Sequence, residues 1–401
     1  MKKKIDIVIS FGLYGLGLLS FLLADIFVSE NFSQENIAEW AFYKSTIIIL
    51  GSIVLLGYDQ VFVRDPSLVT RFFKRFIVQA LIIATLSVVL IAVFKNYTFL
   101  KGLYLFLGVL LFGFVNYSSA SLRACFNLWK AQFSTNFWKI LLLVFLFFGV
   151  FEEQSYFFII PIVLTLVSAL IFGGYKTKED RSIFENLSDA DSRAIATTFL
   201  FTNLTLILAV YGEQFLINLS GDTKASAHLF KYFAVFTPIA LSVNGFLGFY
   251  FGPKIRRQQK MSIEKFKTFS IKISIFAVLI TMLSVVLGYI YMTYFSKTQV
   301  GALDWMIITS LSILCIIRGI YIATSVCLGI FSDKKRLKSV AILFWISAGL
   351  YIIGVFITLN VTSGIKAAQI ISILSVSNWL FRLIVSNIYT TKILKEIHVV
   401  S

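Results

Sequence analysis

The feature that most constrains this chain is a succession of apolar runs about 20 residues long, separated by short polar loops. A run of that length, wound as an α-helix, crosses the hydrocarbon core of a bilayer. The composition agrees, since 58% of the 401 residues are apolar and only 14% are charged, whereas a soluble domain has about 25% charged residues. Because the runs are continuous rather than alternating, the sequence predicts an all-α integral membrane protein.

The runs divide the chain into two halves of six. We predict about twelve transmembrane helices, at residues 6–27, 40–62, 75–94, 101–122, 131–150, 155–174, 195–217, 227–251, 270–294, 304–329, 338–359 and 366–388. The longest loop, residues 175–194, is polar and joins an N-terminal six-helix lobe at residues 1–174 to a C-terminal lobe at residues 195–388. Residues 389–401 form a tail.

Lysine and arginine residues gather in alternate loops. The N-terminus, the connector, the tail and the loops on their side carry most of the 36 basic residues. The opposite side carries only Lys95, Lys101, Lys224, Lys297 and Lys366. Since cytoplasmic loops are enriched in Lys and Arg, we expect both termini to be cytoplasmic, in a bacterial cytoplasmic membrane. The net charge of +16 then reflects topology and not nucleic-acid binding.

The stretch at residues 208–257 shows how each half is built. An apolar helix carries Glu213, a short polar hairpin follows, and a second apolar helix carries Lys231. The first half has the same arrangement with Asp25 and Lys44, at a similar separation along the chain. Both helix pairs start on the same side, so we predict two parallel repeats related by an axis along the membrane normal.

Charged residues inside the predicted spans are the strongest functional signal. An ionised Lys or Arg at mid-helix costs about 2.5–3.5 kcal/mol on insertion scales, so it has to face protein or water. Lys139 and Arg318 lie near the centres of predicted spans, whereas Lys44, Lys231 and Arg382 lie closer to the ends. Snorkelling to the interface is an alternative explanation for the last three.

The acids in or beside the spans are fewer, namely Asp25, Asp59 and Glu213. A cavity with surplus cations suits an anion such as phosphate or pyrophosphate, whereas a sodium or proton site would favour carboxylates. We therefore expect the cations to bind substrate and the acids to gate or couple transport, with an internal ion pair as the alternative for Lys139 and Arg318. Amide side chains in or beside the spans are candidates for binding hydroxyl groups: Asn116, Asn136, Asn203, Gln214, Asn244 and Asn378.

Patterns typical of an enzyme are not found in the sequence. The two histidines, His228 and His398, have no metal-binding partner at a useful spacing, and the three cysteines lie in or beside apolar runs. The sequence contains no GxxxxGK[ST] loop for nucleotide phosphates. We expect neither an enzymatic activity nor a cofactor.

Two stretches resemble a known family. GEQFLINLSGDTKASAHLFKYFAVFTP, at residues 212–238, is similar to the acid of helix seven, the hairpin and helix eight of polysaccharide-transporter (Wzx-type) flippases in the MOP exporter superfamily, which includes MATE exporters. GYDQVFVRDP, at residues 57–66, resembles the end of helix two in that family. Where relatives often have a basic residue after the helix-seven acid, this chain has Gln214.

The resemblance implies a substrate and partners. It implies that the chain moves an undecaprenyl-diphosphate-linked O-antigen or capsule repeat unit across the membrane by alternating access, with coupling to a Na⁺ or H⁺ gradient left open. The partners implied are this lipid-linked anionic oligosaccharide, membrane lipids and other polysaccharide-assembly membrane proteins. In that setting Lys139 and Arg318, one in each half, are expected to bind the pyrophosphate.

Other classes share the hydropathy of the chain. A MATE-like small-molecule exporter would favour acids facing cationic drugs, and the surplus of cations argues against it. An O-antigen polymerase would need a large outer loop with catalytic Arg or His, and every predicted outer loop is short. A passive channel or a structural membrane protein is the remaining alternative.

Overall fold

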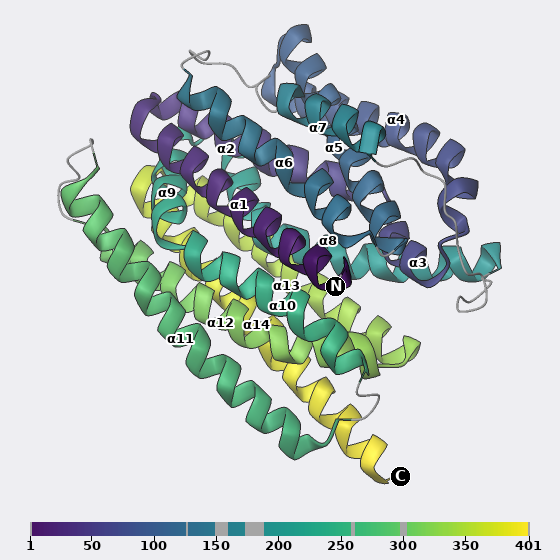
Figure 1. Ribbon diagram of the computed structural model, residues 1–401. Helices are drawn as coiled ribbons and strands as arrows, with labels where there is room; N and C mark the ends of the chain where they lie inside the picture. The colour runs from purple at the N-terminus through teal and green to yellow at the C-terminus, as the bar shows by residue number, and fades with distance from the viewer. Residues whose placement is uncertain are drawn as a thin grey trace. The chain divides into compact units, whose positions relative to one another are not determined.

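The computed structural model describes residues 2–125, 127–148, 159–172, 188–257, 261–296 and 303–399. All regular structure in these residues is helical (Figure 1). The helices are α1 Lys2–Asn31, α2 Gln34–Ile53, α3 Tyr58–Arg64, α4 Leu68–Lys95, α5 Phe99–Ala124, α6 Leu128–Phe147, α7 Ile159–Phe172, α8 Asp189–Ser220, α9 Thr223–Phe236, α10 Pro238–Arg257, α11 Ile263–Tyr294, α12 Trp305–Phe331, α13 Lys334–Val361 and α14 Gly364–Val399. Most of the predicted connector, residues 175–187, lies outside the described residues.

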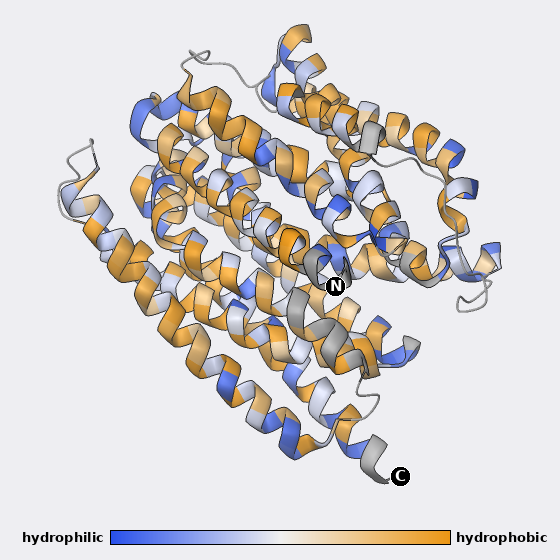
Figure 2. Ribbon diagram, viewed as in Figure 1, coloured by the Kyte–Doolittle hydropathy of each residue, from blue (hydrophilic) through white to orange (hydrophobic). Residues whose placement is uncertain are grey.

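Many of these helices are long and apolar enough to cross a membrane. Eight meet that description by length and composition, and a ninth is added if the bent pair α9 and α10 is one span. Hydrophobic residues make up much of the length of the helices (Figure 2). Within its described residues the chain is thus all-helical, and its long apolar helices are typical of a multi-pass membrane protein. Each of the twelve predicted ranges overlaps one helix or one interrupted pair.

Helix α11 illustrates how the helices divide their faces. The middle of its buried side is a stripe of small residues at helical spacing, Ala277, Thr281, Ser284 and Gly288, between the larger buried residues Phe266 and Ile273 on one side and Met292 on the other. Leu279, Met282, Leu283 and Val286 are exposed. An exposed face of large apolar residues with a buried face of small ones is typical of a helix that faces lipid and packs closely on its neighbours.

Several helices extend past the predicted spans and begin at capping residues. A side-chain oxygen accepts a hydrogen bond from the backbone N–H three residues later at Thr98, Asp222, Ser262, Asp304 and Asp333. Such caps satisfy N–H groups that the helix itself leaves without a partner. Apart from α12, which begins where its predicted span does, these helices therefore begin in polar sequence, where hydropathy alone places a loop.

The described residues form two compact units. Unit 1 contains residues 1–28 and 39–207, and unit 2 contains residues 29–38 and 208–401. In unit 1, α5 packs against α3, α4, α6 and α7, and in unit 2, α12 packs against α9, α10, α11 and α14. The boundary falls within α8, between Ile207 and Leu208.

The predicted span at residues 40–62 is interrupted between α2 and α3. Leu56 and Gly57 have positive φ angles of 47° and 81°, which stop the right-handed helix. A Cβ atom at residue 57 would lie 2.2 Å from the carbonyl oxygen of Ala196 on α8, so only glycine fits here. Carbonyls beside the break accept hydrogen bonds from Asn116 (3.2 Å to Gly51) and Gln79 (2.6 Å to Val54).

The predicted span at residues 227–251 is interrupted too. Helix α9 ends at Phe236 and α10 begins at Pro238, with an angle of 63° between them. Proline has no N–H and its ring clashes with the preceding turn, which breaks the helix. Ser284 donates a hydrogen bond of 2.7 Å to the carbonyl of Phe236, a group freed by the break. Both interruptions thus occur in the second predicted span of a half.

Candidate functional sites

Unit 1 contains a buried cluster around Asp25. Asp25 lies on α1, and Trp40 and Lys44 lie one turn apart on the same face of α2. Lys44 forms an ion pair with one carboxylate oxygen of Asp25, and the Trp40 indole donates a hydrogen bond of 3.0 Å to the other. The Lys44 ammonium also lies 4.4 Å from the centre of the Phe21 ring. Asp25 and Lys44 are each 6% exposed.

Lys139 adds a second cation to this cluster. Its ammonium lies 5.7 Å from the centre of the Phe21 ring and donates a hydrogen bond of 2.9 Å to Asn136, one turn earlier on α6. Lys44 and Lys139 are close enough for electrostatic repulsion. Two lysines therefore approach one aromatic ring, and one of them, Lys44, pairs with Asp25.

Unit 2 contains a comparable cluster around Glu213. Glu213 on α8 accepts a hydrogen bond from Ser375 on α14 and interacts electrostatically with Arg318 on α12. Arg318 donates a hydrogen bond of 3.0 Å to the carbonyl of Ala209, and the Trp379 indole donates one of 2.8 Å to the same carbonyl. The Arg318 guanidinium lies 4.6 Å from the centre of the Trp379 ring. The acid and the arginine are 3% and 6% exposed.

Arg382 completes the second cluster. Its guanidinium lies 4.1 Å from the centre of the Phe344 ring and 5.7 Å from that of Trp379, and the residue is 0% exposed. Ser375, Trp379 and Arg382 share one face of α14, since they are spaced by one and two turns. Arg318 and Arg382 are thus placed around one indole, in a unit where Glu213 is the adjacent acid.

The two clusters have a common composition. Each has two cations, one acid and an aromatic ring that both cations approach. Lys44 and Arg382 are buried, so neither reaches water as the snorkelling alternative requires. Two cations therefore approach one aromatic ring inside each unit.

Lys231 does not repeat the contacts of Lys44. It is half-buried and interacts electrostatically with Glu30. Glu213 interacts instead with Arg318 and Ser375. The acid and the lysine are separated by a similar number of residues in the two halves, but the two acids have different partners. Glu213 interacts with residues of helices that are distant in sequence.

A polar cavity lies beside the break between α2 and α3. It has a volume of about 240 Å³, and α5, α6 and α8 contribute the other walls. Asp59 on α3 lines it together with Arg123 in the last turn of α5; their charged groups lie 3.7 Å apart, and Arg123 also donates a hydrogen bond of 3.2 Å to the Asp59 carbonyl. The cavity further includes Asn116, Ser119, Thr135 and Asn203. Its polar groups carry one positive and one negative charge.

Sequence reasoning identified only part of this cavity. Asn116 and Asn203 are among the amides singled out as hydroxyl ligands, and Asp59 among the acids. The sequence predicts that Arg123 is one of the basic residues of the loops. Nothing in the sequence distinguishes Ser119 or Thr135 from other small polar residues. Other amides from that set have structural partners: Asn136 donates to Gln132, Asn244 to the carbonyl of Cys315, and Asn378 accepts from Ser347.

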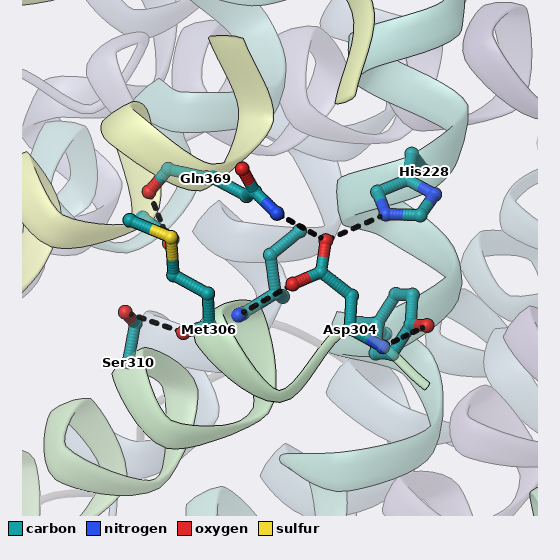
Figure 3. A network of polar contacts seen from close by, with 8 residues as sticks. His228, Asp304, Met306, Ser310 and Gln369 are labelled. Atoms are coloured by element: carbon teal, nitrogen blue, oxygen red, sulfur yellow. Dashed lines mark hydrogen bonds and ion pairs between the residues drawn. The ribbon is translucent and has the colours of Figure 1, made fainter. Parts of the chain in front are cut away.

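A polar network ties together helix ends in unit 2 (Figure 3). Asp304 caps α12 through the Ile307 N–H, and its other oxygen lies 3.1 Å from Nε2 of His228 and 3.0 Å from Nε2 of Gln369. The Asp304 N–H donates a hydrogen bond of 2.9 Å to the Tyr232 hydroxyl. The sequence did not reveal this network, which joins the ends of α9, α12 and α14.

A small cavity lies next to Glu213. It has a volume of about 10 Å³ and is bounded by Gly212, Tyr351 and Asn378, among others. That is room for about one water molecule. Among the described residues, no group of three or more His, Cys, Asp or Glu is placed to hold a metal ion.

No protein-family model, no curated protein and no solved structure matches this chain. The resemblance to polysaccharide flippases therefore stays a prediction from the sequence.

Proposed function

We propose that this chain is a transporter that moves an undecaprenyl-diphosphate-linked oligosaccharide across the bacterial cytoplasmic membrane by alternating access. The observation that carries the proposal is the pair of interrupted helices, α2–α3 and α9–α10, in corresponding positions of the two halves. Transporters bind substrate where spanning helices are discontinuous, because the interrupted backbone is tolerated only beside protein or a cavity. The polar cavity lies at the first of these interruptions.

The buried charges support an anionic substrate. Each unit places two cations beside one aromatic ring, and one cation of each pair interacts with an acid. Such an arrangement leaves a positive charge that an anion stabilises. In the proposal Lys139 and Arg318 are ligands of the diphosphate, as predicted from the sequence, and Lys44, Lys231 and Arg382 are the other substrate-binding cations.

The acids have the second role in the proposal. Asp25, Glu213 and Asp59 gate or couple transport by exchanging their cationic partners between the two access states. The coupling ion, Na⁺ or H⁺, is to be identified by experiment. The proposal also keeps the twelve-span arrangement in two six-helix lobes, with both termini cytoplasmic.

The test uses purified protein in liposomes that contain fluorescently labelled undecaprenyl-diphosphate disaccharide. The unaltered protein should expose the label to a membrane-impermeant quencher faster than empty liposomes do. Lys139→Met and Arg318→Ala should each lower the rate, since losing a charge-assisted contact costs about 1.5–3 kcal/mol, or roughly tenfold to a hundredfold in binding. Arg318→Lys should retain part of the transport rate, because lysine keeps the positive charge.

Lys101→Met is the matched control, because Lys101 is an exposed cation whose pair with Glu39 at 2.8 Å lies at the surface. It should leave the rate unchanged. An unaltered protein that fails to move this lipid refutes the proposed substrate, and equal rates for Lys139→Met and Lys101→Met refute the role of Lys139.

A further inference from the structure

The cavity beside the α2–α3 break is lined by polar residues that are not among the proposed ligands of the diphosphate. Asn116, Ser119 and Arg123 lie at one-turn and two-turn spacing along α5, so all three belong to one face. Thr135 faces them from α6, and its hydroxyl lies 2.7 Å from that of Ser119. Asn203 faces them from α8.

Together these side chains present both hydrogen-bond donors and hydrogen-bond acceptors to a ligand in the cavity. The Nε atom of Arg123 is buried and makes no hydrogen bond within the described residues. The Asn116 amide nitrogen donates to the Gly51 carbonyl, which leaves its oxygen to accept. Asn203 contributes an amide that has both functions. A ligand that satisfies them has hydroxyl or amide groups, which donate and accept in turn.

The opposite charges of the residues that line the cavity argue against a small ion as its ligand. Asp59 and Arg123 offset one another at 3.7 Å, so the cavity lacks the surplus of cations found around Phe21 and Trp379. An anion would be repelled by the carboxylate, and a cation by the guanidinium. A neutral polar ligand keeps this pair intact.

One wall of the cavity is apolar. Leu200, Leu204 and Ile207 line it from the same face of α8 as Asn203. A sugar ring matches this combination, since its edge carries hydroxyl groups and its face carries C–H groups. The volume of about 240 Å³ is just below the range of about 300–1,000 Å³ for drug-sized ligands, as a small ligand requires.

We propose that this cavity binds one uncharged sugar ring, with Asn116, Asn203 and Arg123 bonding its hydroxyl or acetamido groups and α8 packing against its apolar face. Assigning that ring to the lipid-linked substrate rests on the proposed function, whereas binding of a free sugar does not. Arg123 belongs to the basic, cytoplasmic side in the predicted topology. The cavity would therefore receive the glycan on the side where it is loaded.

The binding experiment uses the full chain in nanodiscs and saturation-transfer NMR with three free probes: glucose, N-acetylglucosamine and rhamnose. At least one should give a signal, and Asn203→Leu should weaken its binding about fivefold to thirtyfold, as expected for a lost hydrogen bond with an unpaired ligand group. Thr135→Val tests the opposite wall and should also weaken binding. Equal thermal unfolding of the variants and the unaltered protein confirms that the fold is intact.

Asn360→Leu is the matched control, because Asn360 is exposed on α13 and bonds only within its own helix in the described structure. It should bind as the unaltered protein does. No signal from any of the three sugars overturns the proposal, and so does a signal that survives Asn203→Leu undiminished. Glycine or inorganic phosphate displacing the sugar would also overturn it, since the cavity would then select ions.

The two proposals fail separately. Sugar binding that depends on Asn203, in a protein that moves no lipid-linked disaccharide, refutes the transport function and leaves the sugar site standing. Transport that Asn203→Leu leaves unchanged, with no sugar bound, refutes the sugar site and leaves the transport function standing.

Discussion

Replacing Asp25 by asparagine should destabilise unit 1 more than replacing Lys44 by methionine. An asparagine side chain is isosteric with aspartate and keeps an oxygen for the Trp40 indole, so Asp25→Asn removes the charge alone. Lys44 would then lose the charge of its partner Asp25 while Lys139 still repels it beside the Phe21 ring. Breaking a buried ion pair by removing one partner costs about 3–5 kcal/mol. Lys44→Met should cost less, because Asp25 keeps its hydrogen bond of 3.0 Å from Trp40 and the repulsion between Lys44 and Lys139 is removed.

A double-mutant cycle separates this effect from general damage. Asp25→Asn combined with Lys44→Met should be more stable than Asp25→Asn alone, because the lysine that loses its ion-pair partner is then absent. Asp25→Asn combined with Lys139→Met should show a smaller rescue, since Lys139 has its own partner in Asn136 at 2.9 Å. Lys101→Met, in an exposed pair, should cost no more than about 1 kcal/mol.

The measurement is the free energy of unfolding in mixed detergent micelles titrated with SDS, followed by tryptophan fluorescence. Trp40 and Trp138 are buried in unit 1 and report on it. Equal costs for Asp25→Asn and Lys44→Met, adding fully in the double mutant, would show that Asp25 and Lys44 are not coupled and that Lys139 adds no repulsion. The interpretation of the cluster as cation-rich would then be wrong.

Three further predictions concern the break, the network and the topology. Gly57→Ala should lower stability by at least about 2 kcal/mol, since a side chain at φ 81° is strained and would meet a backbone carbonyl of α8 at 2.2 Å; Gly12→Ala, which meets nothing within 4 Å, should be neutral or slightly stabilising in the same titration. Asp304→Ala should cost about 2–4 kcal/mol because it removes a cap and two side-chain partners, and Asp304→Asn much less, as thermal unfolding will show. Reporter fusions after Ser401 should read cytoplasmic and fusions after Asp222 external; the reverse at both would invert the predicted topology.

The helices were predictable from sequence because the bilayer imposes a local rule. A segment in hydrocarbon has to satisfy its own backbone hydrogen bonds, so a continuous apolar run of about 20 residues is a helix whatever its neighbours do. That is why every predicted range overlaps a helix or an interrupted pair. The ends were predicted less well, since capping residues such as Ser262 extend α11 into polar sequence.

The two interruptions differ in how clearly the sequence predicts them. Pro238 is a local signal, because proline breaks a helix through its own ring. The break at Leu56 and Gly57 has no comparable signal, since leucine favours helices and a single glycine is tolerated in one. That break depends on the close approach of α8, which excludes any side chain at residue 57.

The sequence by itself determined that the chain is built of membrane-type helices and that few charges lie within them, because hydropathy and charge belong to individual residues. It could not determine the partners of those charges. The acid–lysine spacing is nearly the same in both halves, yet Asp25 pairs with Lys44 while Glu213 lies with Arg318 and Ser375. The contacts of Glu213 join α8, α12 and α14, so they exist only after these helices have packed. Side-chain packing depends on the tertiary fold as a whole.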